Sequence, residues 1–199
     1  MELEDFLQLD HFLSPRQVHS DIILTTDDFK RTGDRPAGDG VLVFAKNRVI
    51  LIRTADCLPL FLWSRDGTCA GLLHVGRLGL VQGIEKKALA LVLGAGRKIE
   101  EFNFFIGPGI EGRCYEVGPE AVDSFAGKSF AESIISPGKN DRSFLDLKKG
   151  LFLSLIEEAI DPGRIMDSGL CTFCLSDQFP SYRRQGELAG RIMNFLLLL

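Results

Sequence analysis

The stretch TADCLPLFLW, residues 54–63, is apolar except near its start, where an acid and a thiol stand side by side. Its second half, LPLFLW, is short and rich in branched and aromatic residues, and the turn signal SRDGT follows it, as expected of a buried strand. A carboxylate in such a segment needs a partner or a function, because burying an unpaired charge is costly. Asp56 and Cys57 therefore raise the question of what this strand end does.

Similar segments lie on both sides of this stretch. The other predicted strands are VILIRT (residues 49–54), CAGLLHV (residues 69–75), FNFFIG (residues 102–107) and RIMDSGLCT (residues 164–172). The predicted helices are GIEKKALALVLGAG (residues 83–96), which ends on a glycine C-cap signal, GPEAVDSFAG (residues 118–127) and DLKKGLFLSLIEEAI (residues 146–160). The last of these helices has apolar residues on one face at Leu151, Leu155, Ile156 and Ala159.

The alternation of strands and helices predicts an α/β fold in a single domain, residues 1–199, with a mixed β-sheet layered with helices. The hydrophobic content of 45% is enough for a sizeable core in a chain of 199 residues. The segment TDDFKRTGDRPAGDG (residues 26–40), dense in Gly, Pro and Asp, is expected to be a surface loop. The C-terminal NFLLLL is too short to span a bilayer and is expected to be a strand or helix end in the core.

The charge balance excludes some partners. With 23 Lys+Arg against 27 Asp+Glu the formal net charge is -4, and no block of like charge is present, so nucleic-acid binding is not expected. The N-terminal MELEDFLQLD is acidic where a secretory signal would be basic, so we expect a cytoplasmic protein without a membrane segment. In that compartment the five cysteines stay reduced, which favours ligand or catalytic roles over disulfides.

Histidine is scarce, with three in the chain, and two of them stand at the ends of expected elements. His19 and His74, together with Cys57, form a three-ligand zinc set that leaves a fourth position open for water. An open site lowers the pKa of bound water and polarises a substrate oxygen or nitrogen, with Asp56 as proton acceptor or orienting group. Spacings of 38 and 17 residues match no local zinc motif, so the residues alone favour a buried Cys57 and a core His74.

Three further motifs bear on function. CTFC (residues 171–174) has CxxC spacing but no second pair to complete a zinc ribbon, so its thiols are expected in or near the core. GPGIEG (residues 107–112) satisfies GxGxxG but opens no helix, so it indicates a glycine-rich loop near a ligand rather than a dinucleotide fingerprint. SYRR (residues 181–184) supplies Arg183 and Arg184, which suit phosphate or carboxylate, although a solvated turn is the commoner explanation.

Seven motifs follow one another along the chain: QVHS, AGDGVLV, TADCLPL, HVGRLGLVQGI, IGPGIEGRCYEVG, CTFC and FPSYRRQGELAGR. This series, from about Gln17 to Arg191, resembles the YfiH family, also called the laccase-domain or polyphenol oxidase family. The resemblance implies a single α/β domain with helices packed around a mixed sheet. It also implies that zinc binds His19, Cys57 and His74, which reverses what spacing alone favours.

Two departures from the family pattern concern the substrate pocket. The family usually reads HAGWRG where this chain has HVGRLG (residues 74–79), so Arg77 and Leu78 stand where a Trp and an Arg are expected. A guanidinium displaced by one residue is expected to point elsewhere, which weakens the phosphate pocket unless Arg183 or Arg184 compensates. The chain also begins close to QVHS, so the N-terminal segment of the family is expected to be shortened.

The resemblance implies a zinc-dependent purine nucleoside enzyme, with phosphorolysis of adenosine, inosine or methylthioadenosine by phosphate, and deamination of adenosine. The candidate catalytic residues are His19, Cys57, His74 and Asp56, and the candidate substrate-binding residues are Asp39, Arg183 and Arg184. Two alternatives stay open: a zinc amidohydrolase that edits a peptidoglycan precursor, and a non-catalytic metal-binding domain. Multicopper phenol oxidation is disfavoured, because three histidines are too few for such a centre.

Overall fold

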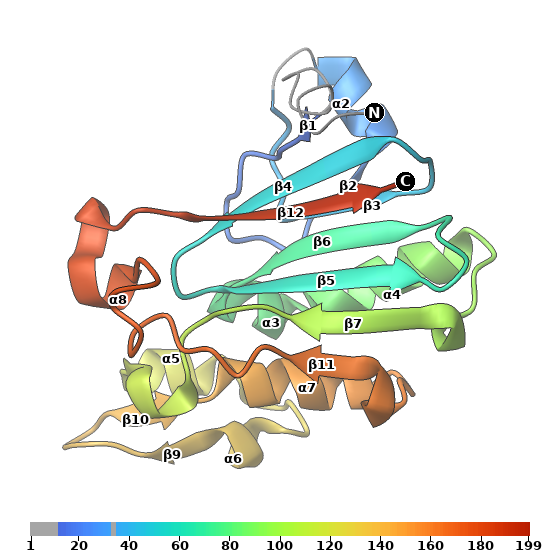
Figure 1. The fold of residues 1–199 in the computed structure, drawn as a ribbon. Helices are drawn as coiled ribbons and strands as arrows, with labels where there is room; N and C mark the ends of the chain where they lie inside the picture. The colour runs from blue at the N-terminus through green and yellow to red at the C-terminus, as the bar shows by residue number, and fades with distance from the viewer. Residues whose placement is uncertain (1–11, 33–34) are drawn as a thin grey trace.

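A six-stranded mixed sheet forms the centre of the structure, a computed structural model that describes residues 12–32 and 35–199 (Figure 1). Its strand order is β11–β7–β5–β6–β3–β2. The strands are β2 (Ile23–Thr25), β3 (Gly40–Val43), β5 (Leu58–Ser64), β6 (Ala70–Val75), β7 (Phe102–Ile106) and β11 (Ile165–Asp167). The two outer pairings are parallel and the three inner ones antiparallel, so the expected mixed sheet is confirmed.

A second sheet packs on one face of the first. It contains β1 (Phe12–Leu13), β4 (Arg48–Thr54) and β12 (Ile192–Leu198), in the order β1–β4–β12. β12 runs antiparallel along the whole of β4, and β1 runs parallel to it. The apolar layer between the sheets consists of Leu13, Val41, Val43, Ile50, Ile52, Ala70, Leu72 and Leu198.

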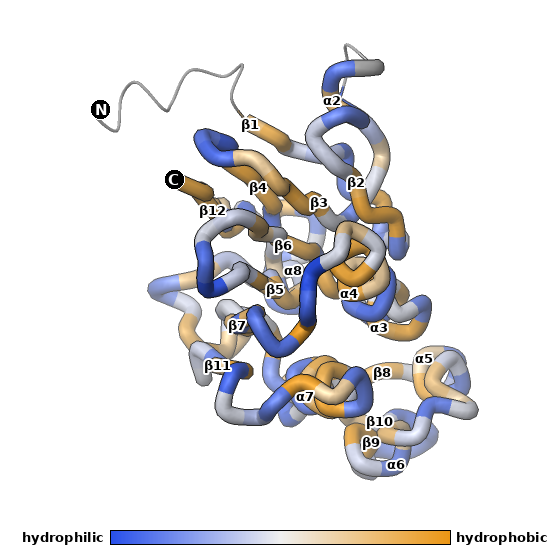
Figure 2. Tube along the Cα trace, turned by 90° about the vertical axis from the view of Figure 1, so that its right-hand side faces the viewer, coloured by the Kyte–Doolittle hydropathy of each residue, from blue (hydrophilic) through white to orange (hydrophobic). Residues whose placement is uncertain are grey.

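Helices cover the opposite face of the central sheet. They are α3 (Arg77–Gln82), α4 (Ile84–Gly94) and α7 (Leu147–Glu157). Figure 2 shows α3 and α4 on one side of β5 and β6, with β12 on the other side. Side chains alternate along β6: Ala70 and Leu72 face the second sheet, whereas Leu73 and Val75 face the helices. The two faces of the central sheet therefore contribute side chains to two separate hydrophobic cores.

The remaining elements surround this layered centre. A small antiparallel sheet contains β8 (Glu116–Val117), β10 (Ser143–Leu145) and β9 (Ile135–Pro137). The shorter helices are α2 (Thr26–Thr32), α5 (Pro119–Asp123), α6 (Ala131–Ile134) and α8 (Tyr182–Gln185). Single 3-10 turns lie at η2 (Ile99–Glu101), η3 (Gly112–Cys114), η4 (Pro162–Arg164) and η5 (Gly186–Leu188). Within residues 12–32 and 35–199, no helix combines the length and apolar character needed to cross a membrane.

The predicted strands and long helices are confirmed, with one consequence that the sequence did not indicate. VILIRT lies in β4 and LPLFLW in β5, and these two strands belong to different sheets. The residues between them, Ala55, Asp56 and Cys57, therefore carry the chain from one sheet to the other. This crossing is the place where the acid and the thiol stand.

The expected surface loop at residues 26–40 is wrong at both ends: residues 26–32 form α2, whereas Gly38, Asp39 and Gly40 are buried and Gly40 begins β3. The Asp28 carboxylate accepts hydrogen bonds from the backbone N–H of Thr25, at 2.8 Å, and from its hydroxyl, at 3.1 Å. The bond from the Thr25 N–H is one half of a capping box, in which the side chain of the third helical residue reaches back to the residue before the helix. Asp27 and Asp28, which we interpreted as loop signals, therefore lie in the first turn of this helix.

Two further expectations about where elements end need correction. α7 ends at Glu157, so Ala159 is exposed in a left-handed conformation (φ 61°), and Ile160 is the buried residue instead. The strand expected at 164–172 is limited to β11 (Ile165–Asp167), and the C-terminal segment forms the strand β12. β12 is an edge strand with one face in the core, whereas Met193 and Phe195 are exposed on the other.

The packing around Gly71 gives a test of the central sheet. Gly71 lies in β6 opposite Leu42 and Leu62, and a Cβ there would overlap the Leu42 side chain and lie 2.9 Å from Leu62 Cδ2. Gly71→Ala is expected to lower the free energy of unfolding by about 1–3 kcal/mol, because it overpacks the core. Gly94→Ala, where nothing lies within 4 Å of the added Cβ, is the matched control and should not destabilise. Equal denaturation midpoints for the two variants would contradict this packing.

Candidate metal centre

The crossing between β4 and β5 is a sharp corner that presents Cys57. Asp56 adopts a left-handed backbone conformation (φ 86°), which is uncommon for a residue with a side chain. The glycine-rich loop predicted at 107–112 packs against the corner: Ile110 N–H donates to the Asp56 carbonyl at 2.9 Å. A Cβ at Gly109 would lie 3.1 Å from the same carbonyl oxygen, so the close approach requires glycine.

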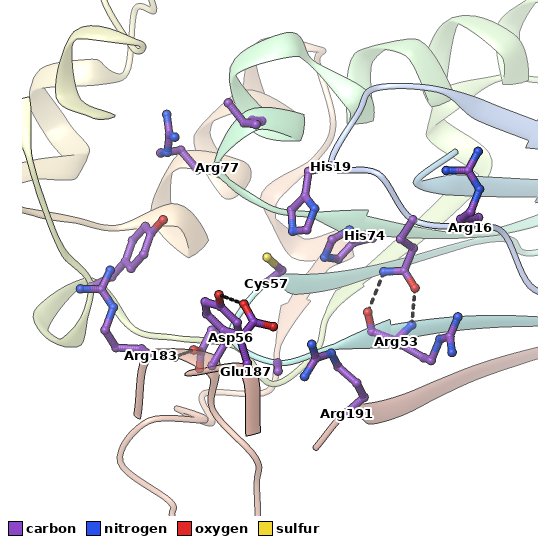
Figure 3. Close-up of a pocket in the computed structure, with 15 residues that line it drawn as sticks. Arg16, His19, Arg53, Asp56, Cys57, His74, Arg77, Arg183, Glu187 and Arg191 are labelled. Atoms are coloured by element: carbon purple, nitrogen blue, oxygen red, sulfur yellow. Dashed lines mark hydrogen bonds between the residues drawn. The ribbon is translucent and has the colours of Figure 1, made fainter. Parts of the chain in front are cut away.

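The three predicted ligands meet beside this corner. One donor atom each from His19, Cys57 and His74 lies within 4.8 Å of the others, and Figure 3 shows the three side chains converging. The two imidazole rings meet edge to face, with centroids 4.9 Å apart. His74 is buried, Cys57 half-buried and His19 exposed, so the group reaches the protein surface on one side. Gly76 leaves space here, since a Cβ would lie 3.0 Å from Cys57 Sγ.

Asp39 fixes the positions of His19 and His74. Its carboxylate is fully buried and accepts hydrogen bonds from the backbone N–H groups of Val18, His19 and Ser20, at 2.7–3.1 Å. These bonds fix a loop in which His19 itself is left-handed (φ 57°). The same carboxylate lies 2.8 Å from Nδ1 of His74, which leaves Nε2 of that ring to face the group. A carboxylate behind a histidine ligand is the usual way to fix its orientation.

The charges in this group stabilise the form of the thiol that binds metals. Burial alone would raise the pKa of Cys57, but His74 and His19 beside it lower that pKa to about 6. Burial would lower the pKa of His74, but Cys57 and Asp39 raise it to about 9. The pKa of Asp39 falls to about 2 against the effect of burial, because His74, Ser20 and Val18 donate to it. A thiolate and two imidazoles whose protons a cation can replace are a metal-binding set.

Both carboxylate oxygens of Asp56 already accept hydrogen bonds from other residues. Thr172 Oγ1 donates at 2.7 Å, Ser181 Oγ at 3.0 Å and the Arg183 backbone N–H at 2.6 Å. The carboxylate thus joins the corner to two segments more than a hundred residues further along the chain. It also lines the pocket described below, so it is a neighbour of the ligand group with a fixed orientation.

A pocket of about 900 Å³ opens around the ligand group. Its lining residues are Arg16, Gln17, His19, Arg53, Ala55, Asp56, Cys57, His74, Arg77, Leu78, Tyr115, Tyr182, Arg183, Glu187 and Arg191. Five of these are arginines, against two carboxylates. Figure 3 shows Arg77 and Arg183 on one side of the ligands, and Arg16, Arg53 and Arg191 on the other. The pocket is therefore suited to an anionic ligand on either side of the ligand group.

The candidate substrate-binding residues have different placements. Arg183 lines the pocket, donates to the Glu116 carbonyl at 2.7 Å, and lies over the Tyr115 ring, 5.0 Å from its centroid. Arg184 is not in the lining, because its guanidinium donates to backbone carbonyls of Thr172, Phe173 and Phe179. Asp39, at 0% exposure, lies behind His74 and does not line the pocket.

The arginine displaced to position 77 still contributes to the pocket. It lines the pocket wall together with Leu78, which is 42% exposed. Its guanidinium donates to the Ser124 hydroxyl at 3.2 Å, which holds it near the Arg183 side. Because α3 begins at Arg77, the first turn of the helix carries both side chains toward the cavity.

Sequence reasoning missed several lining residues that stand inside or beside the motifs. Gln17 makes a reciprocal pair with the Arg53 backbone, with its side-chain oxygen and nitrogen bonded at 2.9 and 2.7 Å. This contact holds the loop that carries His19 against the end of β4. Arg53 itself had a signal, since it is a charge inside an apolar strand. Tyr115 and Arg191 stand in two of the seven motifs, where no pattern assigned them a role.

Comparison with known proteins agrees with this architecture. The model of the family described as multi-copper polyphenol oxidoreductase laccase matches residues 2–199. A solved structure of the Bacillus licheniformis hypothetical protein YfiH superposes with a TM-score of 0.87 at 26% identity. That comparison covers 95% of this chain and 74% of the other, and it confirms the α/β fold.

Two relatives carry names from nucleoside chemistry. A protein named purine nucleoside phosphorylase from Clostridium acetobutylicum is 30% identical over 192 residues, which cover 92% of this chain and 75% of that protein. A protein named adenosine deaminase RL5, from an unknown prokaryotic organism, is 26% identical over 194 residues, covering 93% of this chain and 74% of that protein. With the family model matching nearly every residue and the fold shared with YfiH, this chain belongs to the laccase-like YfiH family.

Proposed function

We propose that this pocket is the active site of a zinc-dependent enzyme that acts on purine nucleosides. The reactions are phosphorolysis of adenosine, inosine or methylthioadenosine, and deamination of adenosine. The observation that carries the proposal is the position of His19, Cys57 and His74 between two groups of arginines. The names of the relatives, purine nucleoside phosphorylase and adenosine deaminase, support this substrate class.

The donor atoms fit zinc. Two imidazoles and one thiolate are ligands that zinc prefers, and three protein ligands are typical of a catalytic site with an open fourth position. The space kept free by Gly76 next to Cys57 and His19 supports the fit. When bound, zinc supplies Lewis-acid activation of water or of a substrate atom. A multicopper centre needs more imidazoles than the three that the chain contains.

The arginines supply the binding of phosphate. Arg77 and Arg183 stand together on one side of the ligand group, where Tyr115 and Ser124 hold them by stacking and hydrogen bonding. A guanidinium already held in place loses less conformational entropy when it binds an anion. We assign the phosphate site to this side. The displacement of the arginine from position 78 to 77 is compatible with this assignment, because Arg77 reaches the pocket.

Aromatic and acidic side chains complete the pocket. Tyr115 and Tyr182 line it and offer flat rings on which a purine can stack. Since three donors orient Asp56, we assign it the role of positioning Cys57 and the loop of Arg183 rather than carrying a proton. Glu187 is the other carboxylate among the described lining residues, and we assign it the proton transfer. Its hydrogen bond from the Tyr182 hydroxyl, at 2.7 Å, orients it.

Chromatography of adenosine incubated with zinc-loaded protein tests the proposed reactions. We expect adenine to form only when phosphate is present, because phosphorolysis consumes it, and inosine to form with or without phosphate. Cys57→Ala should form neither product and should hold one zinc ion fewer per chain, while its circular dichroism stays native. Turnover by a Cys57→Ala protein that lacks that zinc ion would contradict the proposal, as would wild-type protein that converts no nucleoside.

The phosphate side of the pocket has its own test. Arg183→Gln is expected to lower phosphorolysis more than deamination, because only the first reaction binds phosphate. The matched control is Arg48→Gln. Arg48 is the first residue of β4, at the opposite end of the strand from Arg53, and it does not line the pocket. The measurement is the KM for phosphate with inosine as substrate. If Arg183→Gln and Arg48→Gln have the same KM, phosphate binds elsewhere.

The orienting role of Asp39 predicts a loss of zinc affinity. Asp39→Asn cannot accept all five hydrogen bonds as a carboxylate does, so His19 and His74 lose their fixed positions. Removal of such an outer partner typically weakens metal binding roughly 10–100-fold. Competition with a chromophoric chelator measures the affinity, and Ser20→Ala, which removes one donor only, should have a smaller effect. Unchanged affinity in a folded Asp39→Asn protein would show that the histidines orient without it.

A further inference from the structure

Three of the five cysteines form a second cluster that the proposed function does not use. Cys114 ends η3, and Cys171 and Cys174 lie on a turn after β11. Their sulfur atoms all lie within 4.8 Å of one another, and those of Cys114 and Cys174 are 3.3 Å apart. The expectation of thiols in or near the core holds for Cys171, at 3% exposure, whereas Cys174 is exposed. Two segments about sixty residues apart thus bring three soft donors to one point.

The turn that carries CTFC is built around the sulfur of Cys171. The backbone N–H of Glu111 donates to this sulfur at 3.4 Å. Such N–H···S contacts stabilise negative charge on a sulfur atom, which is what a metal-bound thiolate carries. The backbone is fixed as well, because Thr172 N–H donates to the Gly109 carbonyl at 3.2 Å and Leu175 N–H to the Cys171 carbonyl at 3.1 Å. The turn therefore presents Cys171 and Cys174 in the same direction.

A metal ion accounts for this arrangement better than a disulfide does. A bond between Cys114 and Cys174 would use two of the three sulfurs and leave out the buried sulfur of Cys171, to which the Glu111 N–H donates. Zinc and other thiophilic ions prefer thiolate ligands and use all three. Cys174 opens the cluster to solvent, so an ion can enter from that side and a water can take the remaining position.

We propose that Cys114, Cys171 and Cys174 bind a thiophilic ion, Zn²⁺, at a second site. Such an ion cross-links the segment of Tyr115, which lines the pocket, to the turn of Thr172, which does not line it but holds Asp56. Tyr115 follows Cys114 directly, and Thr172, which donates to Asp56, follows Cys171. The ion would thus fix Tyr115, on which Arg183 stacks, and Thr172, which donates to the Asp56 carboxylate.

Metal stoichiometry tests this site separately from any activity. In reduced protein carrying His19→Ala and Cys57→Ala, the first ligand group is removed, and we expect one equivalent of Zn²⁺ to bind. Co²⁺ in its place should give the near-ultraviolet absorption of sulfur-to-cobalt charge transfer. In the same background Cys174→Ser should weaken Zn²⁺ binding by more than about tenfold, the lower end of what even an outer partner costs. Cys174 is exposed, so this change leaves the core intact.

Controls decide what a negative result means. Cys69→Ala, which removes a fully buried thiol outside the cluster, should leave Zn²⁺ binding unchanged. Circular dichroism of each variant shows that the chain is folded. The proposal is overturned if the folded double variant binds no Zn²⁺, or if Co²⁺ binds without the sulfur charge-transfer band. Peptide mapping that finds a Cys114–Cys174 disulfide in protein kept under a thiol reductant would overturn it as well. None of these readouts depends on nucleoside turnover.

Discussion

The buried carboxylate of Asp39 is the constraint on which the site depends. A charge with no exposure survives only when its hydrogen bonds replace water, and here three backbone N–H groups, the Ser20 hydroxyl and His74 do so. Hydrogen bonds to a charged group are each worth about 1.5–3 kcal/mol. The carboxylate therefore ties the loop of His19, the start of β3 and the strand of His74 into one unit. The left-handed backbone of His19 persists because this unit holds it.

Asp56 works in the same way on the other side of Cys57. Its bonds to Thr172, Ser181 and the Arg183 N–H join the crossing between the two sheets to the C-terminal part of the chain. The two aspartates are thus framework groups that bring ligands and arginines together, although Asp56 also lines the pocket. The question posed by an acid in an apolar segment has a structural answer: the acid anchors the corner that presents the thiol.

Local patterns predicted the elements well and their arrangement less well. The strands around LPLFLW and the helices α4 and α7 follow from residue type and periodicity, which act over a few residues. Residue type made His19, Cys57 and His74 a candidate ligand set, but only the resemblance favoured it, because no local spacing links three residues on different elements. The change of sheet at Asp56 left no signal, since β4 and β5 look alike in composition. Pocket arginines such as Arg53 and Arg191 meet only through tertiary packing, so no pattern along the chain joins them.

The most direct test of the account is an anomalous difference map at the zinc edge, from crystals of the protein grown with zinc. We expect an ion on His19, on the sulfur of Cys57 and on Nε2 of His74, with Nδ1 of His74 still bonded to Asp39 as it is here. That result would show that the carboxylate prepares the site before the metal arrives. An ion on Nδ1 of His74, or a map with no ion on these three residues, would contradict the claim that Asp39 organises the centre.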